Sequence, residues 1–595
     1  MADSVLLPDA DLVTVTVEVN GSKIDETYLV ESIETENALN RIAKATVSIV
    51  DGSRVDETFV ISSSSDFEPG AKIKIKAGYH AKEQTIFDGV IVGQRVSAHT
   101  GGASSLRVSC ADAALKLTVA RTASQYYDAK DSDTISSILS KAGLSKDVSE
   151  SQAKLAQQVR SHATDWDFIL ARAEANGHVV LVDGGKVTVG PPKFETAAWK
   201  AEYGVSILDL DLSLDAGAQL SAVAAKAWDP KSQKVVSASS SEPTVNSQGN
   251  LTGKKLADVL GAGGVTLLSQ GDETADTLQT WAKAYLLKSR LARFRGRVST
   301  PGNAGLKTGT QVELDGLGTR FDGAAYITGV RHRIGNGDWQ TEMTFGLDAG
   351  WFADMHRDLS PAPAGATRPG VTGLEIATVL KTDDDPEKER RVKVALPLHD
   401  DGEQGIWVRI ASPYASNGFG MEFLPEVGDE VVLGFVNGDP SAAILLGSLH
   451  SSARPSPIEP DADNTLKTLV TKAQHKMTFD DDKKIITVET PGGHKLVMSD
   501  DAKSITVTDS NSNKIEMAEG GITVSSPKDI TIDAKGSVAI KGQAGVTVSS
   551  PADVGIKGMN VTAEAEIGLT AKGNASAELS AAGETTVKGA MVMIN

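Results

Sequence analysis

Very few residues of this chain stand at spacings that support a chemical reaction. The segment Gly249–Lys255 comes nearest to a phosphate-binding loop, but its two glycines are one residue too close together. No Ser or Thr follows its lysine, and no apolar strand leads into it. No G-x-S-x-G motif occurs, and the single cysteine, Cys110, stands in a strand-like run typical of a small core residue. The pattern therefore predicts no catalytic residue and no bound cofactor.

Candidate metal ligands are equally sparse. The acidic triplets Asp383–Asp385 and Asp480–Asp482 offer too few oxygens at defined offsets for a Ca²⁺ site, and we expect them to be solvated turns. His450, His475 and His494 stand at no spacing that suits a shared metal ion. We predict no metal site. One alternative stays open, because a histidine stacked on the axis of a three-fold assembly would present three copies to an ion.

The strongest pattern is a repeat of eight residues near the C-terminus. Two columns of β-branched apolar residues, two positions apart, recur without interruption, and Gly or Ser-Pro turns separate them. A short strand with two inward side chains per eight residues cannot bury them alone, because it needs other strands stacked about 4.8 Å above and below it. The columns are predicted to form a core shared by three chains: Ile522, Val524, Ile530, Ile532, Val538, Ile540, Val546, Val548, Val554 and Ile556.

Two geometries satisfy this periodicity. Three chains can wrap around a common axis, each giving strands to every face of a prism. A single chain can instead wind coils of 24 residues, and the Ser-Pro pairs at 526–527 and 550–551 fit that solenoid equally well. The repeat by itself leaves both geometries open.

Composition favours a folded β protein that does not bind nucleic acid. The 595 residues include 57 Gly but only 5% aromatic residues, which favours many short strands joined by tight turns. The formal charge of −19 argues against a nucleic-acid partner, which a basic surface would attract. The N-terminus lacks the basic and apolar regions of a Sec signal, and no apolar stretch is long enough to span a membrane. We expect the chain to be made and folded in the bacterial cytoplasm.

Changes in composition divide the chain into five regions. Residues 1–358 mix strands with a few helices, and the Pro-rich and Gly-rich stretch 359–370 reads as a linker. Residues 371–450 carry about five strands, which suits a small barrel of the OB type. A second linker, 451–465, precedes the strand-rich region 466–595.

Within the first region, two strands and two helices are expected. Thr14–Val19 and Lys72–Lys76 alternate between apolar and polar residues, as half-buried strands do. Asp165–Ala175 is predicted to be a short amphipathic helix. Glu273–Arg295 is predicted to be the longest helix, with a basic end.

The middle region carries the motifs of a known family. Arg391–Val394 with Pro397, the strand at Trp407 and Arg409, and Phe435 with Gly447 resemble the OB domain of VgrG spike proteins and of related phage tail spikes. The remaining positions of this OB motif are Pro425, Gly428, Asp429, Gly438, Asp439 and Pro440. Phe67–Gly78, Ser161–Phe168 and Tyr326–His332 resemble segments of the hub in the same family, so the resemblance covers nearly the whole chain.

The resemblance implies a mainly β homotrimer. Its hub would consist of β-barrel domains with a few helices in residues 1–358, its neck of OB-fold barrels, and its needle of a triple-stranded intertwined β-helix over residues 466–595. The family's partners would be the tail tube protein, baseplate or hub proteins, a PAAR-type tip protein, effector cargo and, transiently, a target membrane. Some relatives carry a lysozyme domain, but the segment between Gly447 and Leu466 is too short for one, so no enzyme activity is expected.

Two further groups of residues are candidate contacts. Arg290, Arg293, Arg295 and Arg297 either offset the dipole at a helix C-terminus or contact an acidic surface of the tube or baseplate. The last residues, Met591, Val592, Met593, Ile594 and Asn595, would form a small apolar top on the needle and are predicted to bind the tip protein. The alternative for this end is a strand that frays.

The sequence thus predicts the structural central spike of a contractile injection machine. According to this hypothesis, the trimer caps the tail tube, seats in the baseplate and pierces the target membrane when the sheath contracts. The alternatives are an envelope-degrading enzyme carried on a spike, or a trimeric β-helical fibre or adhesin. Because no toxin or lysozyme domain is visible, we expect an extracellular phage-tail-like particle ahead of a cell-anchored type VI system or a virion.

Overall fold

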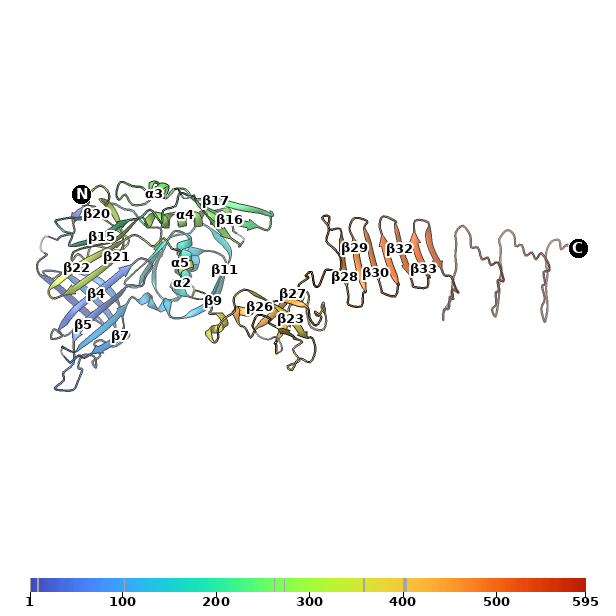
Figure 1. Ribbon diagram of the computed structural model, residues 1–595, viewed down its shortest axis with the longest axis horizontal. Helices are drawn as coiled ribbons and strands as arrows, with labels where there is room; N and C mark the ends of the chain where they lie inside the picture. Colours follow the sequence, from blue (N-terminus) through green and yellow to red (C-terminus); the bar gives the residue numbers. More distant parts are fainter. Residues whose placement is uncertain are drawn as a thin grey trace. The chain divides into compact units, whose positions relative to one another are not determined.

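The computed structural model describes residues 2–594 except 8–9, 101, 260, 262, 272, 357–358 and 400–403. The chain divides into two units, Met1–Leu449 and His450–Asn595 (Figure 1). Strands make up most of the regular structure in both units. No helix in the described ranges has the length and apolar character needed to cross a membrane.

A large sheet organises the first unit up to residue 345. Its strands lie in the order β1-β14-β20-β21-β4-β5-β8-β7-β6-β2-β3, and β15, β19 and β22 are attached beside this path. The bounds are β1 (Asp3–Ser4), β2 (Val13–Val19), β3 (Ser22–Lys23), β4 (Val30–Ala38), β5 (Lys44–Val50), β6 (Lys72–Tyr79), β7 (Lys82–Ser97), β8 (Ser105–Ala111), β14 (Trp199–Glu202), β15 (Asp209–Leu214), β19 (Phe294–Pro301), β20 (Gln311–Asp315), β21 (Gly323–Gly335) and β22 (Asp338–Phe345).

The two predicted half-buried strands are confirmed and pair with each other. Strand β2 runs antiparallel to β6, with Val17 opposite Ile75 and Val19 opposite Ile73. These side chains are buried in one core with Phe67, while the intervening polar residues face outward. A separate core beneath β19 to β22 includes Val298, Val312 and Met343.

A lobe of short helices and strands lies between β8 and β14. It contains β9 (Arg121–Lys130), α1 (Asp131–Lys141), β10 (Ser145–Val148), β11 (Lys154–Thr164), α2 (Asp165–Ala175), β12 (Val179–Asp183) and β13 (Lys186–Gly190). Helix α2 has the predicted bounds. Thr164 caps it by accepting a hydrogen bond from the Asp167 backbone N–H at 3.0 Å. Trp166, Ile169 and Leu170 on its inner face enter the core of the lobe.

The longest helix is shorter than the sequence predicts. Helix α4 (Ala275–Leu291) packs on the sheet β17-β16-β18, and the chain then turns into β19 at Phe294. Arg293 therefore lies in the turn and Arg295 and Arg297 lie on the strand, so the expected helix over 273–295 is wrong at its end. The other elements of this part are β16 (Val223–Asp229), β17 (Lys234–Ser239), α3 (Gly253–Val259), β18 (Val265–Ser269) and α5 (Phe352–Met355).

A closed barrel of five strands follows, in the order β23-β24-β25-β27-β26. Val379, Val394, Val408, Val431 and Leu433 alternate along these strands and are fully buried in its interior. The strands are β23 (Leu374–Lys381), β24 (Val392–Ala395), β25 (Ile406–Ile410), β26 (Glu430–Phe435) and β27 (Ala443–Ser448).

The second unit begins with an antiparallel meander of seven strands, each hydrogen-bonded to the next (Figure 1). The strands are β28 (Leu466–Val470), β29 (Lys476–Asp480), β30 (Ile485–Glu489), β31 (Lys495–Ser499), β32 (Ser504–Thr508), β33 (Lys514–Ala518) and β34 (Gly521–Ser525). The intertwined β-helix is predicted from residue 466, whereas up to Ser525 the structure has a sheet in which each strand pairs with the next strand of the same chain.

Beyond Ser525 the described chain, through residue 594, forms no paired strand of its own. Its backbone bends at 527–528, 535–536, 543–544, 551–552 and 559–560, a spacing of eight residues. The next bend, at 566–567, comes one residue early and matches the slip in the apolar repeat after Val554. The repeat is therefore present in the backbone, while the hydrogen-bond partners that strands need are not supplied by this chain.

One buried histidine in the large sheet makes stability depend on pH. His332 on β21 is 4% exposed, and its Nδ1 lies 2.9 Å from the Thr341 hydroxyl oxygen. Burial, together with the charge of Lys307, lowers the pKa of His332 to about 3. An unfolded histidine takes up a proton near pH 6.5, so below that pH the unfolded state binds more protons than the folded state. Folding stability from this group is therefore present above pH 6.5 and is lost as the pH falls toward 3.

We predict that His332→Asn weakens the loss of stability between pH 6.5 and 4.5. The histidine should account for about 1.4 kcal/mol of unfolding free energy per pH unit in this window. The measurement is urea unfolding followed by tryptophan fluorescence, which reports only the first unit because all seven Trp lie between residues 166 and 407. His99→Asn, at an exposed position, is the control and should keep the unmodified slope. Equal slopes for all three proteins would contradict the prediction.

Candidate functional site

The loop that resembles a phosphate-binding motif is held by packing. Gly249 has φ +64°, and its backbone N–H donates to the Asp322 carbonyl oxygen at 2.7 Å. A β-carbon on Gly249 would lie 2.2 Å from the Arg320 carbonyl oxygen, so glycine is required here by a close approach of two backbones. The loop thus has a structural reason for its glycine.

The acidic triplets are satisfied by neighbouring residues of the chain. Asp385 accepts hydrogen bonds from the Arg391 guanidinium, with Nη2 at 2.7 Å, and this partner holds the pKa of the Asp385 carboxyl well below its usual range. Lys381 Nζ lies 2.7 Å from Asp384 Oδ2. In the second triplet, the Asp480 carboxylate accepts a hydrogen bond from the Lys483 backbone N–H. No group of three or more metal-ligating side chains comes together in the part of the chain that the structure describes.

The single cysteine lies in the core. Cys110 on β8 is 2% exposed, and burial raises the pKa of its thiol to about 12. It packs among Ile91, Val108 and neighbouring apolar residues of the large sheet. Its position is that of a small apolar residue, as the sequence suggests.

Two of the four arginines predicted to contact a partner are internal. Arg290 is 3% exposed and donates to both carboxylate oxygens of Glu242, at 2.6 and 2.9 Å. Arg293 is 6% exposed and donates to the carbonyl oxygens of Leu251 and Gln248. Their side chains hold the extended segment 242–251 against the end of α4, so the predicted tube or baseplate contact is wrong for both.

The other two arginines remain at the surface. Arg295 and Arg297 lie on β19 with side chains 38% and 51% exposed, near Asp348 and Glu342. Their contact with the tube or baseplate stays a prediction.

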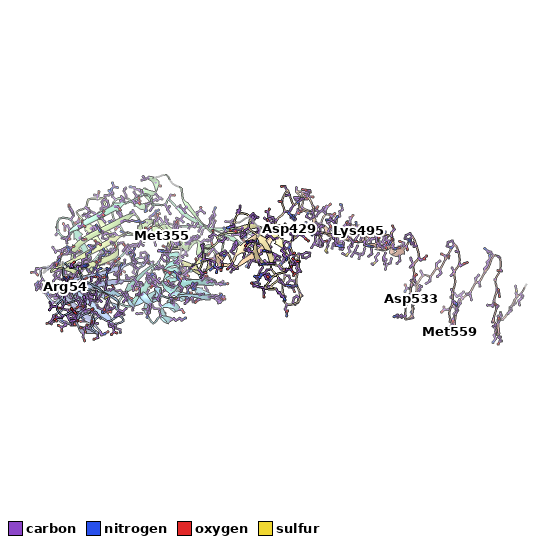
Figure 2. The ribbon with its side chains drawn as sticks, turned by 60° about the horizontal axis from the view of Figure 1, so that its bottom comes forward. Arg54, Met355, Asp429, Lys495, Asp533 and Met559 are labelled. Atoms are coloured by element: carbon purple, nitrogen blue, oxygen red, sulfur yellow. The ribbon has the colours of Figure 1, made fainter. Side chains whose placement is uncertain are left out.

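The OB motif marks the turns and strands that close the barrel. Gly428 has φ +85°, and its N–H donates to the Val379 carbonyl oxygen at 2.7 Å. Asp429 accepts from the Glu426 N–H at 2.9 Å, and Asp439 accepts from the Ser441 N–H and hydroxyl. These residues shape loops, which gives them a structural role in the barrel (Figure 2 labels Asp429).

Sequence reasoning missed an exposed apolar loop on the same barrel. Between β25 and β26, six large apolar side chains are between 46% and 60% exposed: Tyr414, Phe419, Met421, Phe423, Leu424 and Val427. The sequence contains a signal for this surface, because a loop that connects two strands is normally polar and this one is rich in large apolar residues. A loop of this composition indicates a contact surface.

The predicted trimer-core residues are unburied in the single chain. All ten, from Ile522 to Ile556, are between 52% and 78% exposed. Side chains near Asp533 and Met559 project from a single trace in Figure 2, with no second strand beside them. Because a single-chain solenoid would bury these columns within one molecule, their exposure favours the shared core.

The same apolar surface continues along the meander. Met477 lies opposite Val488, Leu496 opposite Val507, and Ile515 opposite both Val507 and Val524. These side chains share one face, called here the apolar face, with Leu469, Phe479, Ile486, Met498, Ile505, Met517 and Ile522. The alternating residues Thr468, Thr478, Thr487, Thr506 and Thr523 lie on the opposite face.

This continuous apolar surface is the candidate functional site. Burying a Val, Leu, Ile or Met side chain contributes roughly 1.5–3 kcal/mol, so leaving so many in water is costly. The exposed columns beyond Ser525 also lack strand partners. What the arrangement can do is bind further strands with a matching apolar face, and a second and third copy of the same chain have such a face.

The predicted tip residues are also exposed where the structure describes them. Met591, Val592, Met593 and Ile594 are between 50% and 91% exposed. Asn595, the last of the predicted tip residues, lies outside the described residues. Tip binding stays a prediction.

Three protein-family models match the chain in series. Residues 9–336 match the Alg8 N-terminal domain, residues 375–450 match the type VI secretion system/phage-baseplate injector OB domain, and residues 484–595 match the phage baseplate V C-terminal trimerisation domain. The mainly β fold class with an OB barrel is confirmed, and the expected homotrimer is consistent with the trimerisation family.

Curated relatives match over shorter segments. The type VI secretion system spike protein VgrG4b of Pseudomonas aeruginosa is 34% identical over 110 residues, covering 17% of this chain and 14% of that protein. VgrG3 of Vibrio cholerae, also a type VI secretion system spike protein, is 31% identical over 120 residues, covering 18% of this chain and 11% of its own length. The chain thus spans less than a fifth of the length of these two relatives.

Solved structures of tail proteins are similar over larger parts of the chain. The tail protein of Neisseria meningitidis MC58 covers 57% of this chain and 98% of its own length, with 17% identity and a TM-score of 0.43. The Escherichia coli c3393 protein, a type VI secretion system component, covers 73% of this chain and 99% of its own length, with 13% identity and a TM-score of 0.37. Likenesses of this strength carry no argument about function.

We predict that Ile532→Asp or Ile540→Asp abolishes self-association. In a shared core, three carboxylates would meet in an apolar interior, where an unpaired charge costs several kcal/mol. Light scattering on the purified full chain measures the outcome as a fall from an oligomer to a single chain. Thr531→Asp, which places the same charge on the alternate face, is the control and should leave association intact. A stable oligomer with Asp at position 532 or 540 would contradict the shared core.

The first matched model alone covers more than half of the chain, and the other two follow it in an order that fits the closed barrel and the unpartnered apolar surface. The chain therefore belongs to the Alg8 N-terminal domain family and is a VgrG-like spike protein, with an injector OB domain and a C-terminal trimerisation domain after residues 9–336.

Proposed function

We propose that this chain is the structural central spike of a contractile injection machine and works as a homotrimer. Three hub regions cap the tail tube and seat in the baseplate, and the three C-terminal regions wind into one needle that pierces the target membrane when the sheath contracts. The observation that carries the proposal is the apolar surface from β28 to Ile556, which is unburied in one chain and overlaps the trimerisation family match at 484–595.

The proposed needle suits mechanical work. In a prism of three chains every backbone N–H and C=O finds a partner, and no long unpaired edge runs along its length. The repeated turns contain small residues such as Gly536 and Gly542, which keep the corners narrow. Resistance to buckling would then come from backbone pairing and from a dense Val/Ile interior.

The proposed role is not enzymatic. Packing explains Gly249 and Cys110, and an ion pair with Arg391 explains Asp385. One relative, 26% identical over 134 residues, carries the name actin cross-linking toxin VgrG1, and the match covers 12% of that protein. A peptidoglycan-release assay on the pure chain tests the enzymatic alternative, and release of fragments would contradict the proposal.

The proposal extends to location and partners. The chain assembles in the bacterial cytoplasm and works in an extracellular phage-tail-like particle, with the tail tube, baseplate proteins and effector cargo as its partners. The curated relatives named as type VI spike proteins support the wider class of machine. Purified particles from cell-free culture medium should contain this chain, whereas its recovery only with cell envelopes would favour a cell-anchored system.

The decisive measurement is the mass of the full chain in solution. Light scattering at micromolar concentration should give three times the 62.2 kDa of one chain. A well-folded species with the mass of a single chain would overturn the spike, the needle and the piercing role together.

We predict that the paired substitution Val592→Asp and Ile594→Asp abolishes binding of a PAAR-type tip protein. Three copies of each aspartate would place charge on a small apolar top that must be desolvated by the tip. Co-purification of the tip protein with the full chain measures the effect. Thr586→Asp, at an already polar position, is the control, and both variants should remain trimers by light scattering. Full tip binding by the Val592/Ile594 variant would place the tip contact elsewhere.

A further inference from the structure

The meander has two edges of turns with opposite chemistry. The turns 471–475, 490–494 and 509–513 lie along one edge, and the turns 481–484, 500–503 and 519–520 lie along the other. We call the first the basic edge and the second the acidic edge. Each strand between them has five residues, so the edges of one sheet lie roughly 17 Å apart.

Charge differs in sign between the two edges. The acidic edge carries Asp480, Asp481, Asp482, Asp500, Asp501 and Glu519 against Lys467, Lys483, Lys484 and Lys503. The basic edge carries Lys472, Lys476, Lys495 and Lys514 against Glu489 and Asp509, and it adds His475 and His494. The side chains of Asp482, Asp500 and Asp501 are exposed, as are those of His475 and His494.

A groove of about 580 Å³ runs beside the basic edge. Its apolar wall consists of Val488, Leu496, Val507 and Ile515 from the apolar face, and its rim includes His494 and Asn513 from the turns. The groove therefore joins the apolar face to the basic edge. The rim also contains Lys495 and Lys514 beside Asp509 and Asp529. An occupant must therefore offer apolar side chains to the wall and charged groups that can pair with these lysines.

A second copy of this chain has both features side by side. Its apolar face reaches its own acidic edge through Phe479, Ile486, Met498 and Ile505, which lie on the strands beside the turns 481–484 and 500–503. In a ring of three identical copies each contact joins two different surfaces, because a three-fold axis cannot bring an edge against itself. If the apolar faces point to the axis, the basic edge of one copy must meet the acidic edge of the next.

We propose that each copy docks its acidic edge on the basic edge and groove of the neighbouring copy, so that every corner of the prism is an ion-paired seam. This inference rests on the proposed trimer and names the surfaces that hold it together.

The heights of the turns along the axis also fit this docking. Strands stack about 4.8 Å apart, and successive turns alternate between the two edges, so each turn on one edge lies one strand above the preceding turn on the other edge. The three-fold rotation that relates the copies does not change the height of a turn. At each corner the turn 490–494 of one copy therefore lies between the turns 481–484 and 500–503 of the next copy.

The test is a charge-reversal cycle in the full chain. One variant reverses the acidic edge with Asp482→Lys, Asp500→Lys and Asp501→Lys. A second reverses the basic edge with Lys472→Asp, His475→Asp and His494→Asp, and a third combines all six substitutions. Within one chain the two edges lie farther apart than the Debye length of about 8 Å at 0.15 M salt, so coupling between them reports contact between copies.

The readout is the urea concentration at which the trimer dissociates, followed by light scattering. Each single-edge variant should lower this midpoint by on the order of 0.5 M, because like charges then meet at all three corners. The combined variant should recover at least half of either loss, and about 1 M NaCl should shrink the differences by screening. A control with Thr478→Lys, Thr506→Lys and Thr523→Lys adds charge to the opposite face and should show no recovery when combined with either edge variant.

The outcomes separate the seam from the trimer itself. If the unmodified chain is trimeric and the losses of the two edge variants simply add, the edges do not meet and the seam is wrong. If the unmodified chain has the mass of one chain, the proposed function fails first. One edge variant alone could dissociate fully even without urea. The variant with all six substitutions should then be a trimer again, and that result supports the seam.

Discussion

The structure depends on one constraint: the apolar side chains of the second unit have no interior to enter within their own molecule. A short strand that presents two apolar side chains every eight residues has one buried face, and only other strands can cover it. In a folded domain such residues would lie in a core, as Val394 and Leu433 do in the OB barrel. Here Ile540 is 70% exposed and Ile556 is 78% exposed. The second unit is therefore one side of an interface that begins at β28 and continues past Val554.

The first unit shows the contrasting case. Its cores are complete within one chain, because apolar and polar residues alternate along the strands and the helices α2 and α4 pack on the sheets beside them. Even its buried charges are satisfied internally, as the pair Arg290 and Glu242 shows. The first unit therefore buries its cores within one chain, and the apolar loop around Phe419 and Phe423 on its OB barrel is left exposed. The second unit differs in this respect, because its apolar side chains stay exposed in a single chain.

Much of this organisation could be predicted because a β repeat is a local signal. The alternation in Thr14–Val19 and Lys72–Lys76 and the helix at Asp165–Ala175 each depend on a few neighbouring residues, and the structure has all three elements. The end of α4 was missed because a helix and a strand can both carry arginines two or three residues apart. The burial of Arg290 and Arg293 depends on partners more than forty residues away in sequence, and no local pattern reveals them.

The structure also differs from the prediction over β28 to β34, where an intertwined β-helix was expected and a meander is found. This difference has a physical consequence. In the meander every strand pairs with its neighbour in the same chain, so its contacts are local and should form early. The octads after Ser525 have no neighbouring strand in the same chain, so any pairing they make cannot be a local contact of this kind. A preformed meander presents a rigid apolar face with a fixed register, and three such faces can align before the octads pair. The order along the chain therefore places strands of fixed register directly before octads that have no strand partner in the same chain, and a one-residue slip among the octads would turn their apolar columns to the other face.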